Sequence, residues 1–166
     1  MKSKPLTPRS PEWTPTAPLQ VSATREVAAT PTEVFEALAD HESWPQWFKA
    51  IKRVERFGDL DEGIGSNRRV FINDRIAVDE EFIVWEPGRA WGFTALSATV
   101  GVLRSLNELV TIDEIEPGRV RVTYLMALEP KPWAKPLMWL AQRQLEKNLG
   151  EALDNLGPHI AATRSA

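Results

Sequence analysis

The sequence contains no cysteine and only two histidines, His41 and His159. Without a thiol, disulfides, a cysteine nucleophile, cysteine-ligated zinc and iron–sulfur clusters are all excluded. Two histidines are also too few for a multi-histidine metal site. We therefore predict no metal and no cofactor.

Long apolar runs and long basic runs are both absent. Nothing approaches the about 18 to 20 consecutive apolar residues of a membrane span, and the first residues lack the apolar stretch of a secretory signal. Lysine plus arginine number 20 against 23 aspartate plus glutamate, and the net charge of −3 gives no electrostatic reason for nucleic-acid binding. We expect a cytoplasmic protein with no integral membrane segment and no nucleic-acid partner, whose oligomeric state stays open.

The 166 residues divide into an N-terminal segment and one domain. Residues 1–19 hold five of the 13 prolines, mixed with Ser, Thr and Lys, and this composition predicts a disordered tail. Trp13 is the one large aromatic there and is a candidate for docking on the domain. Residues 20–160 contain no linker or repeat and are interpreted as a single domain.

The first half of that domain alternates between strand and helix signals. Residues 20–28 alternate apolar and polar side chains, as a half-buried strand does. Thr30, Pro31 and Glu33 then predict a helix start with a capping box. Pro45, between two tryptophans, favours a second short helix or turn over residues 40–49.

The second half contains six β-rich runs and one long helix. The runs are separated by short Gly, Pro or Asp breaks that imply antiparallel hairpins, and they cover 51–57, 65–73, 75–85, 89–96, 103–114 and 118–128. From 133 to 156 apolar residues recur at spacings of three and four, with Gly157 and Pro158 as the predicted stop. The fold class is therefore α+β: a seven-stranded antiparallel sheet, with two short helices after the first strand and a long C-terminal helix over its apolar face.

This order of elements is similar to the START-like superfamily, in particular its polyketide cyclase/dehydrase and lipid-transport branch. The resemblance covers residues 20–157. It rests on the segments Ala29-Thr30-Pro31, Leu38-Ala39-Asp40, Trp44-Pro45 with Trp47, Gly65, Val84-Trp85-Glu86-Pro87 and Gly118-Arg119-Val120. The resemblance implies a helix-grip fold with a deep, mainly apolar cavity for a lipid, polyketide, quinone or similar molecule. It does not separate enzymes from carriers.

Three polar side chains are candidates for chemistry inside such a cavity. Alternation places Glu80 and Glu108 on the inward faces of their strands, where burial would raise their pKa values and suit them to acid and base roles. The alternative is that they pair with Arg68, Arg69 or Arg104, or sit at the cavity mouth. Tyr124, the only tyrosine, shares an inward face and would polarise a ligand carbonyl or make a structural hydrogen bond.

The candidate ligand-binding residues come from the tryptophan pair, the inward strand faces and the long helix. They are Trp44, Trp47, Phe82, Val110, Val122, Tyr124, Leu137, Ala141 and Leu145. For the tryptophans and the helix residues the alternative role is ordinary core packing.

Three functions follow, in order of preference. The first is binding of one hydrophobic small molecule between the sheet and the C-terminal helix. The second is a polyketide aromatase/cyclase or dehydratase that uses Glu80, Glu108 or Tyr124 for proton transfer. The third is a protein-interaction module whose exposed aromatics, Trp13 among them, bind a partner.

Overall fold

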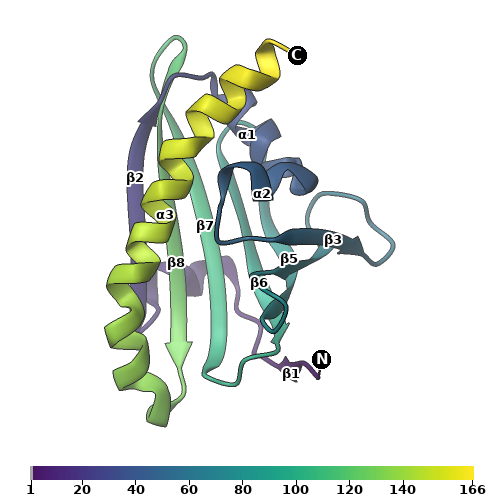
Figure 1. Ribbon diagram of the computed structural model, residues 1–166, viewed down its shortest axis with the longest axis vertical. Coiled ribbons are helices and arrows are strands. Elements are labelled where there is room, and N and C mark those ends of the chain that lie inside the picture. The colour runs from purple at the N-terminus through teal and green to yellow at the C-terminus, as the bar shows by residue number, and fades with distance from the viewer. Residues whose placement is uncertain (1) are drawn as a thin grey trace.

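The computed structural model describes residues 2–166, in which an antiparallel sheet curves around a long C-terminal helix (Figure 1). The strands are β1 (Lys4–Pro5), β2 (Leu19–Val27), β3 (Arg53–Phe57), β4 (Asn67–Phe71), β5 (Ala77–Glu86), β6 (Ala90–Ala98), β7 (Leu103–Glu116) and β8 (Arg119–Pro130). The α-helices are α1 (Pro31–Ala39), α2 (Trp44–Trp47) and α3 (Lys135–Arg164). Short 3-10 helices are η1 (Pro11–Thr16), η2 (His41–Ser43) and η3 (Pro132–Ala134).

The sheet order is β2-β8-β7-β6-β5-β4-β3, and β1 pairs with β6. Hairpins join β3 through β8 in sequence, whereas β2 reaches β8 across the chain, with Thr24 opposite Thr123. The helix-grip fold class is confirmed, and the six predicted β-rich runs correspond to β3 through β8. The sheet contains one strand more than predicted, because the N-terminal segment contributes β1.

The start of α1 follows the predicted capping box. The Thr30 hydroxyl accepts a hydrogen bond from the Glu33 backbone N–H at 3.2 Å, and the Glu33 carboxylate accepts one from the Thr30 N–H at 2.8 Å. Two of the otherwise unpaired N–H groups at the helix start are thereby satisfied. The cap fixes where the chain leaves β2 and turns over the concave face of the sheet.

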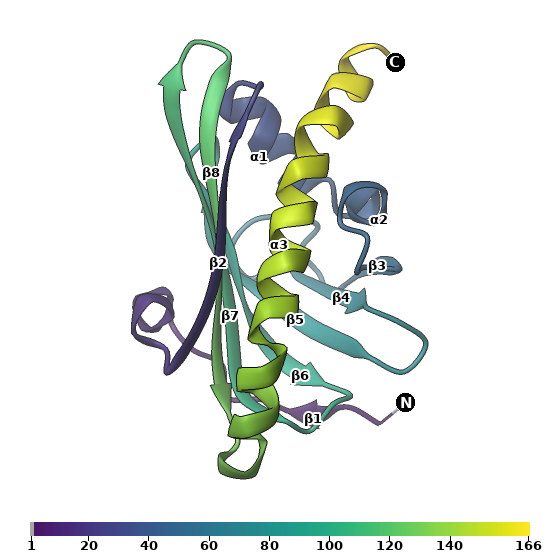
Figure 2. The same ribbon diagram turned by 60° about the vertical axis from the view of Figure 1, so that its left-hand side comes forward.

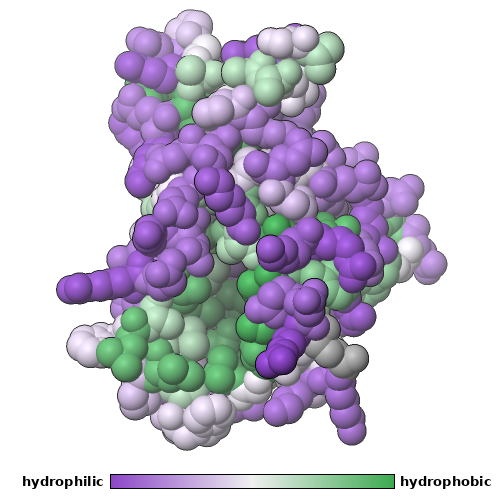
Figure 3. Space-filling view, in the orientation of Figure 1, coloured by the Kyte–Doolittle hydropathy of each residue, from purple (hydrophilic) through white to green (hydrophobic). Residues whose placement is uncertain are grey.

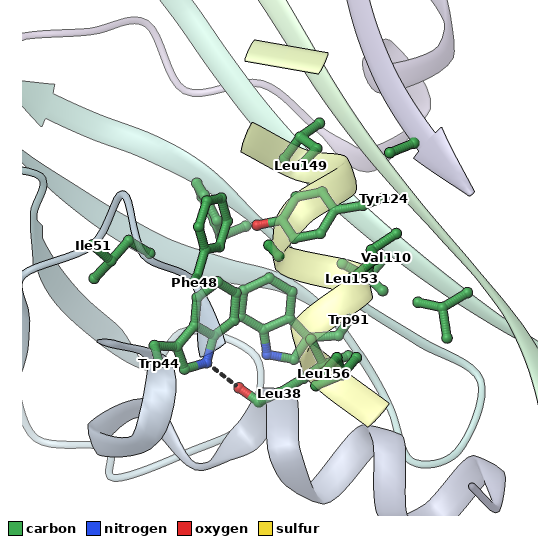
Figure 4. Close-up of a cluster of buried hydrophobic side chains, with 14 of the residues drawn as sticks. Leu38, Trp44, Phe48, Ile51, Trp91, Val110, Tyr124, Leu149, Leu153 and Leu156 are labelled. Atoms are coloured by element: carbon green, nitrogen blue, oxygen red, sulfur yellow. Dashed lines mark hydrogen bonds between the residues drawn. The ribbon is translucent and has the colours of Figure 1, made fainter. Parts of the chain in front are cut away.

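Helix α3 crosses the concave face, and α1 and α2 cover the remaining part of that face near the C-terminal end of α3 (Figure 2). The core between these layers is rich in aromatic rings (Figure 4). The Trp44 ring stacks on Trp91 at 5.1 Å between centroids, and the Trp44 indole N–H donates to the Leu38 carbonyl at 2.9 Å. The tryptophan beside Pro45 thus locks α2 onto the sheet. None of the helices within residues 2–166 combines the length and apolarity needed to cross a bilayer.

The predicted end of the C-terminal helix at Gly157 and Pro158 is wrong. Helix α3 continues to Arg164 with Pro158 inside it. The added turns have tertiary contacts: Ile160 is buried on the same face as Leu156, and Arg164 forms an ion pair with Glu33 at 2.5 Å. These contacts outweigh the free-energy cost of a proline inside the helix. A prediction from the Gly-Pro pair alone does not include them.

The N-terminal segment also differs from the disordered tail predicted for residues 1–19. Pro5 in β1 lies opposite Ser97 in β6, and the next residues continue this pairing: the Leu6 N–H donates to the Leu96 carbonyl at 2.9 Å and the Thr7 N–H to the Arg104 carbonyl at 2.8 Å. The segment therefore occupies the gap where β6 and β7 diverge.

Side-chain contacts anchor the rest of this segment on the convex face of the sheet. Arg9 donates to Ser105 Oγ at 3.0 Å and forms an ion pair with Glu129 at 2.6 Å. The Asn107 side-chain amide donates to Thr14 Oγ1 at 3.1 Å. The prolines exclude regular ladder bonding, but specific polar partners on β7 and β8 replace it. Composition alone does not reveal such partners.

Trp13, the aromatic predicted to be able to dock, is half-buried in this segment. The Arg9 guanidinium carbon lies 5.3 Å from the centroid of its ring, a cation–π distance. Trp13 thus packs beside the polar anchor of its own segment.

Candidate functional site

A cavity of about 380 Å³ lies between the concave face of the sheet and the first half of α3. Most of its wall is apolar and comes from β4 through β8 and α3, for example Val70, Val78, Leu106, Met126, Met138 and Leu149. Figure 3 shows a hollow with hydrophobic walls between the lower part of α3 and the strands beside it. The volume lies within the about 300–1,000 Å³ typical of small-molecule sites.

One buried ion pair contributes to the wall of this cavity. Arg68 in β4 lies directly opposite Glu80 in β5, and Arg68 Nε donates to Glu80 Oε2 at 2.6 Å. The two side chains are only 1% and 5% exposed. Glu80 therefore pairs with Arg68, which was one of the alternatives predicted from the sequence. Both partners line the cavity.

Four aromatic rings surround the Arg68 guanidinium. Its central carbon lies 4.2 Å from the Trp44 ring centroid, 4.8 Å from Trp91, and 5.4 Å from both Phe82 and Phe93. Cation–π attraction thus supplements the single carboxylate. The Nη1 atom is buried and has no hydrogen-bond partner among residues 2–166. Arg68 lines the cavity, and a buried donor without a partner is suited to an acceptor atom.

A second polar pair, Glu108 and Tyr124, completes the polar part of the wall. Glu108 lies in β7 and Tyr124 in β8, diagonally across the ladder, because Tyr124 is directly opposite Val110. The Tyr124 hydroxyl donates to Glu108 Oε2. Both side chains are buried and line the cavity, and the inward orientation expected from strand alternation is observed for both.

Burial raises the pKa values of both carboxyl groups. Loss of hydration raises the pKa of Glu80 to about 7, against the opposing effect of Arg68. Loss of hydration, together with the charge of Glu80, raises the pKa of Glu108 to about 8. Burial and the neighbouring Glu108 raise the pKa of the Tyr124 phenol well above its ordinary value.

These pKa values leave little net negative charge in the site near neutral pH. Near pH 7 most Glu108 groups are protonated, because the pKa of Glu108 is about 8. The Arg68 charge is opposed by Glu80 at hydrogen-bond distance. The polar groups of the cavity wall are therefore Arg68, hydrogen-bonded to Glu80, and the largely protonated Glu108 carboxyl.

The predicted ligand-binding residues divide into two groups. Trp44, Tyr124, Ala141 and Leu145 line the cavity. Five others do not: Trp47, Phe82, Val110 and Val122 are fully buried in the packed core, and Leu137 is 54% exposed. Leu137 is therefore neither a cavity-lining residue nor a buried core residue.

Sequence reasoning missed the central position of Arg68. It was considered only as one of three partners for the carboxylates. The signal was nevertheless present, because Arg68 and Val70 share one face of β4 and Val70 is buried. The hairpin residues Ile72 and Val100, which also line the cavity, gave no signal because they lie beyond the regular strands.

His41 lies next to this cluster but does not line the cavity. Its ring stacks on Phe82 at 5.0 Å between centroids, and neither ring nitrogen has a hydrogen-bond partner among residues 2–166. Burial, helped by the nearby positive charges of Arg68 and Arg56, lowers the pKa of His41 to about 3. A histidine just after a helix commonly interacts with the last helix carbonyls, but His41 makes no such hydrogen bond. Within the same residues, no cluster of three potential metal ligands occurs.

Comparison with known proteins gives matches over nearly the whole chain. A family model described as "Polyketide cyclase / dehydrase and lipid transport" matches residues 18–161. An uncharacterized protein of Mycobacterium tuberculosis is 33% identical over 154 residues, which cover 93% of this chain and 92% of that protein.

Solved structures share the fold at lower sequence identity. A START superfamily protein from Mycobacterium smegmatis aligns with a TM-score of 0.70 at 18% identity, over 87% of this chain and 98% of its own. An aromatase/cyclase from Streptomyces aligns with a TM-score of 0.71 at 17% identity, over 86% and 93% of the two chains.

Proposed function

The chain belongs to the polyketide cyclase/dehydrase and lipid-transport family, and on that premise we propose that its cavity binds one hydrophobic small molecule with an uncharged, oxygen-bearing head group. The observation that carries the proposal is the apolar cavity lined by Arg68, whose buried Nη1 has no hydrogen-bond partner among residues 2–166. Burial of the apolar body of the ligand would supply most of the affinity.

The polar pairs argue for an uncharged head group. A carboxylate placed beside Arg68 would compete with Glu80 for the same guanidinium and would add a second negative charge in a buried site. A ketone, ester or quinone oxygen would accept the Arg68 hydrogen bond without that cost. The proposed ligand class is therefore a long or polycyclic carbonyl compound rather than a fatty acid.

Native mass spectrometry of freshly purified protein, followed by solvent extraction, tests whether a ligand is present. A direct comparison then tests its class: a long-chain methyl ketone and the fatty acid of equal carbon number are titrated at pH 7 by calorimetry. We expect the ketone to bind at least about ten-fold more tightly, a difference of about 1.4 kcal/mol. Tighter binding of the acid would contradict the uncharged head group, and binding of neither probe, with an empty extract, would contradict the cavity function.

Two substitutions on α3 provide a matched pair. Ala141→Trp places an indole in the cavity wall, whereas Leu140→Trp places the same group one residue earlier, at a position that is 73% exposed. We expect Ala141→Trp to abolish ligand binding and Leu140→Trp to leave it unchanged. Equal loss in both variants would show that the cavity is not the binding site.

The second candidate is an enzyme of the cyclase or dehydratase type. The observation that favours it is the pair of buried carboxyl groups with pKa values of about 7 and about 8, because both protonation states are then populated near neutrality. Glu108→Gln and Glu80→Gln test this role with the extracted ligand or its precursor as substrate. Unchanged turnover in both variants would remove the acid–base mechanism and leave the carrier function.

A further inference from the structure

The second turn of α3 is apolar around its whole circumference. Residues 137–141 have the sequence LMWLA, and only Met138 among them is buried against the protein. Leu137, Trp139 and Leu140 are 54%, 72% and 73% exposed, and Trp133 in η3 is 67% exposed. We call these four exposed side chains the tip patch. A helix turn that is apolar on all sides is suited to apolar surroundings on all sides.

The tip patch lies at one end of the molecule. In Figures 1 and 2, η3 and the start of α3 form the lowest part of the structure, below the strands of the sheet. In Figure 3 hydrophobic side chains at this end lie directly beside the hollow. The same turns line the cavity on their inner side through Met138, Ala141 and Leu145. A surface that covers the patch would therefore lie at the cavity mouth.

The charged residues in the chain segment that carries the tip patch are all positive. Lys131, Lys135 and Arg143 lie within the segment between Glu129 and Glu146, which contains no acidic residue. None of the three cations forms an ion pair with any residue from 2 to 166. This local excess occurs in a chain of net charge −3, so it is a property of this end of the molecule.

We propose that the tip patch docks on an anionic lipid membrane surface, with the leucines and tryptophans in the interface and the three cations at the lipid phosphates. Helices that lie in a membrane interface typically combine tryptophan and leucine with lysine and arginine. Each cation near an anionic lipid surface strengthens the binding. A second copy of the chain fits less well. A two-fold contact through the patch would bring the same three cations of both copies together.

The docked arrangement would place the cavity mouth at the bilayer, so an apolar ligand could move between membrane and cavity without crossing water. This consequence depends on the proposed ligand binding, but the docking itself does not. The two are tested separately, because vesicle binding is measured without added ligand.

Vesicle flotation tests the proposal with the full-length protein. Vesicles contain phosphatidylcholine alone, or phosphatidylcholine with about one third phosphatidylglycerol to give an anionic surface. We expect binding to the anionic vesicles, weaker binding to the neutral ones, and a decrease as salt is raised, because salt screens the cations.

Paired variants separate the patch from general surface effects. Trp139→Ala with Leu140→Ala removes exposed apolar area without removing core contacts, and alanine maintains the helix. We expect at least a ten-fold loss of vesicle binding. The matched control is Leu60→Ala with Ile64→Ala, which removes side chains 52% and 66% exposed on the loop between β3 and β4 and should leave binding unchanged.

Charge reversal gives a second pair. Lys135→Glu with Arg143→Glu should weaken binding to anionic vesicles by at least about twenty-fold, since each cation contributes roughly five-fold. Arg119→Glu with Arg121→Glu changes the net charge equally at the opposite end of the molecule and should have little effect.

Three results would overturn the proposal. The first is no binding to anionic vesicles by the native protein. The second is equal losses in the patch and control variants. The third is a concentration-dependent dimer in analytical ultracentrifugation that the Trp139 and Leu140 substitutions dissociate while vesicle binding is absent, because the patch would then be a subunit interface. Loss of ligand binding with vesicle binding intact would contradict the proposed function alone.

Discussion

At the residue scale, the Arg68–Glu80 pair determines the polarity of the cavity. Removal of one partner leaves the other charge buried without compensation, whereas replacement of both by apolar side chains removes the desolvation cost of both. We expect Arg68→Met to lower the free energy of unfolding by about 3–5 kcal/mol, and Arg68→Met with Glu80→Leu to recover most of that loss. Urea unfolding of the single variants and the double variant measures the coupling. Additive losses would contradict a direct pair.

The second residue-scale prediction concerns the protonation of Glu108. Its pKa of about 8 should be visible as a late-titrating carboxyl carbon in a side-chain NMR titration. The Tyr124 hydroxyl stabilises the charged form, so Tyr124→Phe should raise this pKa further. A Glu108 carboxyl that titrates near 4.5, its ordinary value, would show that water reaches it in solution.

At the scale of elements, the N-terminal segment acts as a strap across β6, β7 and β8. Arg9 holds it through one ion pair and further hydrogen bonds at a partly buried position. We expect Arg9→Ala to cost about 1–3 kcal/mol and to speed hydrogen exchange at the β6 and β7 amides beneath the strap. Arg121→Ala is the control, since its ion pair with Glu26 is half exposed and should contribute less than about 1 kcal/mol. Similar losses in both variants would show that the strap adds nothing specific.

Helices and strands were predicted correctly where interactions between residues close in the sequence determine them. The capping box at Thr30 and the alternation of β8 are properties of neighbouring residues, so both were recognised. The predictions based on Pro158 and on the N-terminal prolines were wrong because they, too, used neighbouring residues alone. Their local preference is correct, but contacts with residues more than 80 positions away in the sequence override it, such as Arg9 with Glu129 and Arg164 with Glu33.

For the candidate site, the sequence predicted only which face of each strand a side chain points from. Alternation placed Glu80, Glu108 and Tyr124 inward, but it does not say which inward residues meet packed neighbours and which meet a cavity. Val110 and Val122 share the inward faces of Glu108 and Tyr124 and are nevertheless fully packed. That distinction depends on where α3 diverges from the sheet, which no short segment of sequence contains.

At the scale of the whole molecule, the buried titratable groups predict how stability depends on pH. The raised pKa values of Glu80 and Glu108 give stability that is fully present below 4.5 and is lost as the pH rises through about 7 and about 8. The lowered pKa of His41 acts oppositely: its contribution is present above 6.5 and is lost as the pH falls toward about 3. The lowered pKa of the exposed Glu33 adds a loss only below 4.5.

Together these groups predict a free energy of unfolding that decreases from about pH 5 to about pH 8, most steeply just below pH 7, where the opposing contribution of His41 is already falling. Urea unfolding across this range measures the slope. In Glu108→Gln, where residue 108 cannot ionise, the steepest part of the slope should fall to about a quarter of that in the native protein, because His41 still opposes the remaining Glu80. A stability that rises over this range in the native protein would contradict the buried, proton-binding carboxyl groups.

The pairing of β2 with β8 has a consequence for synthesis on the ribosome. Thr24 and Thr123 face each other across 99 residues of sequence, so β2 has no partner strand until nearly the whole chain has been made. Until then its edge is open to other chains, and closing so large a loop makes this the slow step of folding. The strand that begins the domain is therefore among the last to be secured, and a nascent chain paused before β8 is the form of this protein most exposed to aggregation.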